Sequence, residues 1–95
     1  MNDINKTLEE RGKEYGKFIN HAEITQRLKH VVKDGLQSSG VLLTNDMQEA
    51  LDMICHKIGR IVNGNPSNID SWHDISGYAT LVENRLIQEK NKHSG

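Results

Sequence analysis

The sequence lacks most of the features that mark a secreted or a nucleic-acid-binding protein. Its single cysteine, Cys55, excludes an internal disulfide and a zinc site built from several cysteines. One tryptophan, two tyrosines and one phenylalanine are too few for a platform that stacks single-stranded bases. Twelve Lys and Arg residues oppose thirteen Asp and Glu residues, so the net charge is −1. The basic surplus that usually neutralises nucleic-acid phosphates is missing, and we expect no nucleic-acid partner.

Long hydrophobic segments are missing too. No run of apolar residues approaches the roughly 20 that a membrane-spanning helix needs. The first residues lack the basic and apolar regions of a signal peptide, and the scarcity of cysteine fits a reducing compartment. We therefore expect no membrane partner and a cytoplasmic location. The 95 residues are enough for one domain, 1–95, and not for two separate cores.

Turn-forming residues divide the chain into four segments. The single proline, Pro66, lies in an Asn- and Gly-rich loop over 63–68, and weaker breaks occur at 15–16 and 38–40. Between the breaks, apolar residues recur at spacings of three and four, as they do along an α-helix. No segment alternates with period two for long. We predict an all-α fold with helices over about 3–14, 17–36, 45–63 and 70–91.

The third and fourth of these helices are expected to form a long antiparallel hairpin within a small helical bundle, because the loop between them is short. Two long helices and two lesser ones make a thin core for a monomer. We therefore expect a homo-oligomer that buries the second sides of these helices, with a four-helix monomer as the alternative. The apolar stripes consist of Met47, Leu51, Ile54, Ile58 and Ile61 on the third helix and Trp72, Ile75, Ala79, Val82 and Leu86 on the fourth.

Local signals predict where these two helices begin and end. Asn45 with Gln48 three residues later predicts a capping box at the start of the third helix. Ser71 with Asp74 predicts a second capping box in the fourth helix. Gly64 follows the third helix at the position where a left-handed C-cap residue is typical.

Charged residues form a polar stripe on the third helix. At about 100° per residue, Asp52, His56 and Arg60 lie within about 60° of Glu49, and Lys57 lies about 80° to the other side. Any solvated amphipathic helix shows such a stripe, so a purely structural role is the alternative interpretation. The carboxylates are nevertheless grouped at one end and the cations toward the loop. This grouping suggests a site for a hard divalent cation and an anion.

The fourth helix contributes further residues to that predicted site. Mg²⁺ is usually bound by a few carboxylates together with substrate phosphates. In an antiparallel hairpin, Lys57 and Arg60 should lie nearer to Asp74 than Glu49 does. The two carboxylate pairs would then meet only midway along the hairpin, or through a second hairpin or subunit. We expect Mg²⁺ on Glu49, Asp52, Asp70 and Asp74, phosphate on Lys57, Arg60, Arg11 and Lys13, and substrate contacts from Trp72, His73 and Tyr78.

Zinc is the weaker interpretation of the metal-ligating residues. His21, Cys55, His56 and His73 have spacings that fit no known zinc-ligand pattern. Cys55 lies at the edge of an apolar stripe, so we expect it to be a core residue and not a nucleophile.

Two sequence blocks resemble a family of small bacteriophage and prophage proteins that has no settled activity. The first is ERGKEYG at 10–16, and the second runs from EALDMICHKIGRI at 49–61 through NGNP at 63–66 into DSWHDISGYA at 70–79. More remotely, the second block is similar to the all-α nucleotide pyrophosphohydrolases of the MazG type. That pattern sets two acidic residues three apart on one helix and two more on the next, which hold Mg²⁺ against a nucleoside triphosphate. Here the first pair is Glu49 and Asp52, and the second pair, Asp70 and Asp74, stands four apart.

The resemblance implies a bacteriophage-encoded protein of the host cell cytoplasm that binds nucleotides through Mg²⁺. The implied reaction cleaves a nucleoside triphosphate to the monophosphate and pyrophosphate, with Glu49, Asp52 and Asp74 as catalytic residues that orient a metal-activated water. The alternative belongs to another class. It is a non-enzymatic helical adaptor or inhibitor that binds a host or phage protein through its polar stripes and its second apolar surface.

Overall fold

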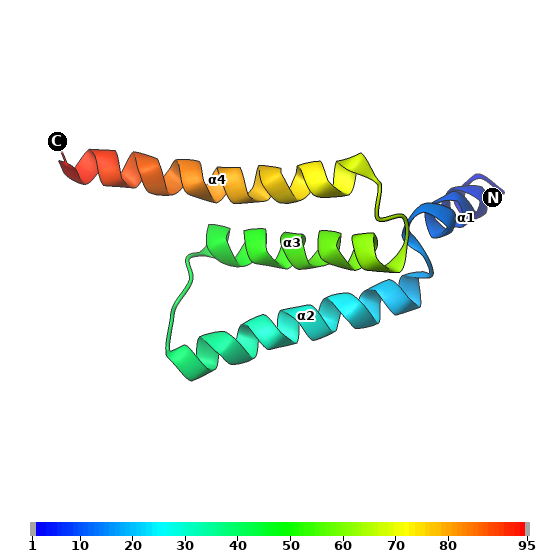
Figure 1. Ribbon diagram of the computed structural model, residues 1–95, viewed down its shortest axis with the longest axis horizontal. Coiled ribbons are helices and arrows are strands. Elements are labelled where there is room, and N and C mark those ends of the chain that lie inside the picture. The colour runs from blue at the N-terminus through cyan, green and yellow to red at the C-terminus, as the bar shows by residue number, and fades with distance from the viewer. Residues whose placement is uncertain (1, 95) are drawn as a thin grey trace.

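The computed structural model describes residues 2–94, and every regular element in that range is a helix (Figure 1). The all-α prediction is therefore confirmed. The third predicted helix has the predicted bounds, whereas the second runs three residues further than expected. The four helices are α1 (Asn2–Tyr15), α2 (Phe18–Ser39), α3 (Asn45–Asn63) and α4 (Ile69–Ser94).

α3 lies at the centre of the molecule, between α2 and α4 (Figure 1). Within the described residues α3 packs on both neighbours, whereas α2 and α4 do not pack on each other. α1 lies beyond the end of this layer and packs only lightly against α2 and α3. The molecule measures 57 × 29 × 26 Å, with a radius of gyration of 16.6 Å, compared with about 12–13 Å for a compact domain of this length. The protein is thus an elongated three-helix layer with α1 as an appendage.

The hydrophobic core is correspondingly small. Ala50 and Cys55 are the buried hydrophobic residues among those that the structure describes, and no large side chain there is fully buried. The burial of Cys55 confirms its prediction as a core residue. No helix in the described range combines the length and apolar character needed to cross a bilayer.

Both predicted capping boxes are wrong. Asn45 is the first residue of α3, and the N-cap position belongs to Thr44, which makes no side-chain capping bond. At α4, the side chain of Asn68 caps the helix. Its Oδ1 accepts hydrogen bonds from the Ser71 N–H (3.0 Å) and the Ser71 hydroxyl (3.3 Å). Several polar residues stand near each helix start, and the residue at the boundary lies one position before the predicted one at α3 and three positions before it at α4.

Gly64 is the C-cap residue of α3, as predicted, but its backbone is not left-handed (φ −139°, ψ −130°). Gly64 is instead a point of close approach. A Cβ at this position would collide with the backbone of Glu14 and Tyr15 at the end of α1. The left-handed residue in this joint is Gly16 (φ 79°), where a Cβ would meet the backbone of Asn63. These two glycines let the α1–α2 turn lie directly against the α3–α4 loop.

Candidate functional site

α3 presents the predicted polar stripe, because the helix forms over the whole range that carries it. Glu49, Asp52, His56 and Arg60 follow one another at steps of three and four residues, which places neighbouring Cβ atoms about 5–6 Å apart. Glu49 is exposed, and the other three are half-buried. Asp52 Oδ1 accepts a hydrogen bond of 3.1 Å from the Gln48 side-chain amide. One of the two carboxylates of this stripe is thus already engaged within the helix.

The acidic residues of α4 do not join this stripe. Asp74 forms an ion pair of 2.9 Å with the Nζ of Lys57, and Asp70 is exposed in the first turn of α4. The Lys57 hydrogen bond is the main reason that the pKa of Asp74 lies below its usual value. Among the side chains that the structure describes, those of residues 3–92, no group of three or more His, Cys, Asp and Glu residues is arranged to hold a metal ion. One chain therefore does not bring the four predicted ligands together, and Mg²⁺ stays a prediction.

The predicted phosphate-binding cations are dispersed as well. The side chain of Lys57 is nearly buried, and Asp74 neutralises its charge. The guanidinium of Arg60 lies 4.3 Å from the centre of the Tyr15 ring, in a cation–π contact that joins α3 to the end of α1. Arg11 and Lys13 are exposed on α1. Two of the four cations thus hold the fold together, and the other two lie on the appended helix.

The three predicted substrate-contacting residues lie on different sides of α4. Trp72 donates a hydrogen bond of 2.8 Å from Nε1 to the carbonyl of Pro66, while its side chain stays exposed. His73 is exposed, and Tyr78 is half-buried. The direction of Trp72 differs from that of Asp74 by about 200° around the helix, so Trp72 does not flank that carboxylate.

A pair of histidines is the feature that sequence reasoning missed. The Nε2 of His21 on α2 lies 3.3 Å from the Nδ1 of His56 on α3, and the two rings are nearly perpendicular. Thr25 Oγ1 lies 3.5 Å from the same His21 nitrogen. A signal for His21 was available in the sequence. It stands at helical spacing from three residues of α2, so the spacing indicates the side of α2 that packs against α3. These residues are Thr25, Leu28 and Val32.

Both members of this histidine pair are held in the neutral form. Burial is the main reason that the pKa of His56 falls to about 4, and the positive charges of Arg60 and Lys57 act in the same direction. Burial also lowers the pKa of His21, although the backbone of Gly59 opposes that shift. The pair is therefore a neutral, packed contact between α2 and α3 near pH 7.

The α3–α4 loop forms a polar joint with α1. Glu14 Oε1 accepts hydrogen bonds from the side-chain amides of Asn68 (2.7 Å) and Asn65 (3.0 Å), which lower the pKa of Glu14. The Asn63 amide donates to the carbonyls of Tyr15 and Lys17 at 3.0 Å. The asparagines of this loop thus hold α1 in place.

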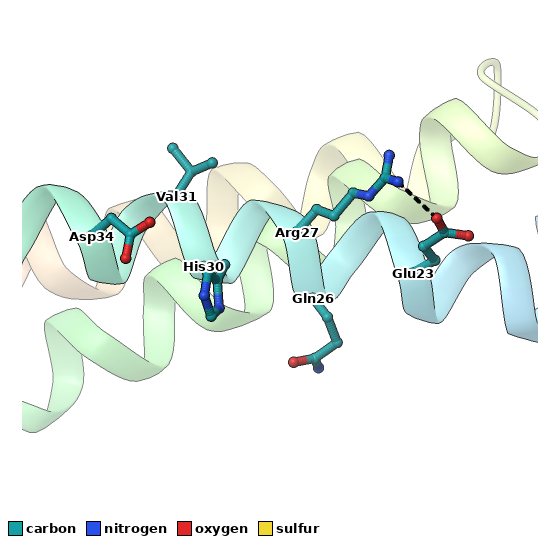
Figure 2. A pocket seen from close by; sticks show the side chains of 6 residues that line it. All are labelled: Glu23, Gln26, Arg27, His30, Val31 and Asp34. Atoms are coloured by element: carbon teal, nitrogen blue, oxygen red, sulfur yellow. Dashed lines mark ion pairs between the residues drawn. The ribbon is translucent and has the colours of Figure 1, made fainter.

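One hollow in the surface is lined by none of the predicted site residues. It has a volume of about 580 Å³, and Figure 2 shows that all of its lining side chains come from α2. An ion pair of 2.9 Å joins Arg27 to Glu23 along its edge. Because no second element forms a wall, we assign no ligand site to it. Its lining residues are Glu23, Gln26, Arg27, His30, Val31 and Asp34.

A second depression, of about 270 Å³, is an almost entirely apolar groove between α3 and α4. Leu51 and Ala79 line it from the two helices. On α3, Leu51, Ile58 and Val62 point within about 40° of one another. On α4, Trp72, Ala79 and Leu86 do the same. We call this surface the apolar face. It consists of Leu51, Ile58 and Val62 from α3 and Trp72, Ala79 and Leu86 from α4.

The fold and these surfaces define a small all-α protein, built as a three-helix layer with an exposed apolar face. The chain belongs to the DUF6378 family, since the model of this domain of unknown function matches residues 1–86. The match includes α1, α2 and α3 and most of α4. No curated protein and no solved structure matches the chain.

Proposed function

We propose that this protein is a non-enzymatic helical binding module that docks onto a protein chain through its apolar face. The observation that carries the proposal is the exposure of this face. Val62 is 62% exposed, Trp72 56% and Leu86 43%. A contiguous apolar patch of this kind is typical of a surface that another protein covers.

The composition of the face supports a protein partner. None of its six residues is charged, as in the central part of most protein interfaces. Its single tryptophan, the residue type most enriched among binding hot spots, is already oriented by the hydrogen bond to Pro66. A side chain held in place loses less entropy on binding.

The state of the charged residues supports the same class of function. Lys57 and Asp74 neutralise each other, Asp52 is bonded to Gln48, and Arg60 is stacked on Tyr15. Such contacts stabilise the helical layer. A catalytic site would instead need several of these groups to converge on one substrate.

Photo-crosslinking tests this proposal in the cell that expresses the protein. Replacement of Leu86 by p-benzoylphenylalanine should give covalent adducts between this chain and a protein. A protein partner of any size would support the proposal. Leu81, which is 66% exposed on the same helix but about 140° away, is the matched control position. Equal adducts from both positions, or none from position 86, would contradict the proposal.

One observation favours a second candidate, Mg²⁺-dependent nucleotide binding or pyrophosphohydrolysis. The formed α3 helix sets Glu49 and Asp52 one turn apart, with Arg60 further along the same stripe. Because Asp74 is paired with Lys57, a complete metal site would need residues of another subunit. The test is incubation with Mg²⁺ and each deoxynucleoside triphosphate, with Glu49→Gln as the control variant. An absence of both pyrophosphate release and any melting shift would exclude this candidate.

A further inference from the structure

We infer that the partner covering the apolar face is a second copy of this chain, so that two three-helix layers pack face to face as a symmetric dimer. This inference rests on the proposed function, because it specifies which protein occupies the face. Three properties of the chain support it: the excess of exposed surface, the size of the core and the symmetry of the α4 stripe.

The exposed area is larger than that of an average folded monomer of this mass. The chain exposes 7366 Å², whereas a folded monomer of 10.8 kDa exposes about 5,500 Å². The excess is therefore about 1,900 Å² per chain. Standard interfaces bury about 800 Å² per partner, and obligate homodimers bury about 1,000–2,500 Å² per partner. The excess thus lies within the range that an obligate dimer removes from water.

The size of the core indicates that the partner must be present whenever the chain is folded. With Ala50 and Cys55 as the buried hydrophobic residues of the described range, a single layer buries little apolar surface. A partner that binds only the folded chain stabilises it in proportion to the logarithm of its concentration. A second copy is the one partner that is always made together with the chain.

The α4 stripe has the symmetry that a two-fold interface requires. Ala79 lies seven residues after Trp72 and seven before Leu86, so the three side chains share one direction on the helix. If two α4 helices cross at Ala79 in opposite directions, Trp72 of one copy lies against the partner's Leu86, and the reverse contact follows by symmetry. The small side chain of Ala79 allows close approach at the crossing. Because the apolar face contains no charged residue, the two-fold axis brings no like charges together.

Sedimentation equilibrium of the full chain tests the inference. We expect a mass of twice 10.8 kDa for the wild type. Leu86→Glu and, on α3, Val62→Glu should each weaken dimerisation by at least about 100-fold, because each buries an unpaired carboxylate. Leu81→Glu adds the same charge to an exposed leucine outside the apolar face and should leave the dimer intact.

A measurement on the wild type tests the dimer even if the variants do not fold. Trp72 is the single tryptophan, so dilution of the wild type through its dissociation constant should shift the fluorescence emission to the red. A folded wild type that remains at 10.8 kDa at every concentration would overturn the inference. A dimer that resists Leu86→Glu and Val62→Glu but is broken by Leu81→Glu would overturn the assigned face. If the chain is a monomer and position 86 still crosslinks to a different protein, the inference of a dimer is refuted. The proposed function is then still supported.

Discussion

The Nζ of Lys57 lies 2.9 Å from the Oδ2 of Asp74, and this ion pair joins α3 to α4. The two partners differ in their access to water. The side chain of Lys57 is only 11% exposed, whereas that of Asp74 is 40% exposed. If the pair is broken, the carboxylate can therefore be hydrated more readily than the ammonium group.

This difference predicts an asymmetric response to mutation. Asp74→Ala should lower the free energy of unfolding, because it leaves the nearly buried side chain of Lys57 without its partner. Lys57→Met keeps most of the apolar stem and should cost clearly less. Chemical denaturation of the two variants and the wild type measures both effects. Equal losses would show that Lys57 reaches water in the folded state.

A second ion pair should make the protein sensitive to acid. Arg85 on α4 donates to both carboxylate oxygens of Asp46 (2.9 and 2.8 Å), and its hydrogen bond is the main reason that the pKa of Asp46 falls to about 2. Because the folded-state pKa is lowered, the stabilisation is present above about pH 4 and is lost as the pH falls toward 2. An NMR titration of the Asp46 carboxyl should give a midpoint near 2, and Arg85→Gln should return it toward 3.8. An unchanged midpoint in Arg85→Gln would contradict this assignment.

The helices themselves were predictable, because their signals are local. Apolar spacing indicated α3 over 45–63, and the Asn- and Gly-rich composition indicated the loop after it. The ends of the helices were harder to predict from the sequence. Thr44 and Asn45 are adjacent residues of similar capping preference, and only the observed backbone shows that Thr44 is at the boundary.

Contacts between distant segments could not be predicted from the sequence. Gly64 has its role because Glu14, fifty residues earlier, lies against its backbone. The contact between His21 and His56 likewise depends on how α2 packs on α3. The polar stripe of α3 was predictable as a stripe. Whether its carboxylates meet those of α4 depends on the rotation of each helix about its own axis, and that rotation is set by packing.

The neutral histidine pair predicts a loss of stability in mildly acidic solution. Unfolding returns His56 from a pKa of about 4 to its ordinary value of 6.5. The contribution is therefore fully present above about pH 6.5 and is lost as the pH falls toward 4. We expect a loss of about 1–2 kcal/mol over this window, less than the full shift implies, because His56 is only half-buried.

Chemical denaturation at pH 7, 6 and 5 measures this dependence. His56→Gln should flatten the profile above pH 4, whereas His30→Gln, at an exposed histidine of α2, should leave it unchanged. The window lies above the acid range in which Asp46 is protonated, so the two effects can be separated. A wild-type stability that stays constant from pH 7 to pH 5 would contradict the buried, neutral state of the pair.

Glycine substitutions provide a test of the α2–α3 contact with a built-in control. Gly59 is buried in α3, and a Cβ there would collide with Thr25 Oγ1 and lie 3.0 Å from two atoms of the His21 ring. Gly35 and Gly77 also lie within helices, but a Cβ at either would meet nothing within 4 Å. Alanine is favoured over glycine in a helix by about 1 kcal/mol. Gly35→Ala and Gly77→Ala should therefore raise the free energy of unfolding by up to that amount, whereas Gly59→Ala should lower it by about 1–3 kcal/mol through overpacking. Thermal or chemical unfolding of Gly59→Ala gives the sign of this effect. A stabilised Gly59→Ala variant would mean that α2 does not lie this close to α3.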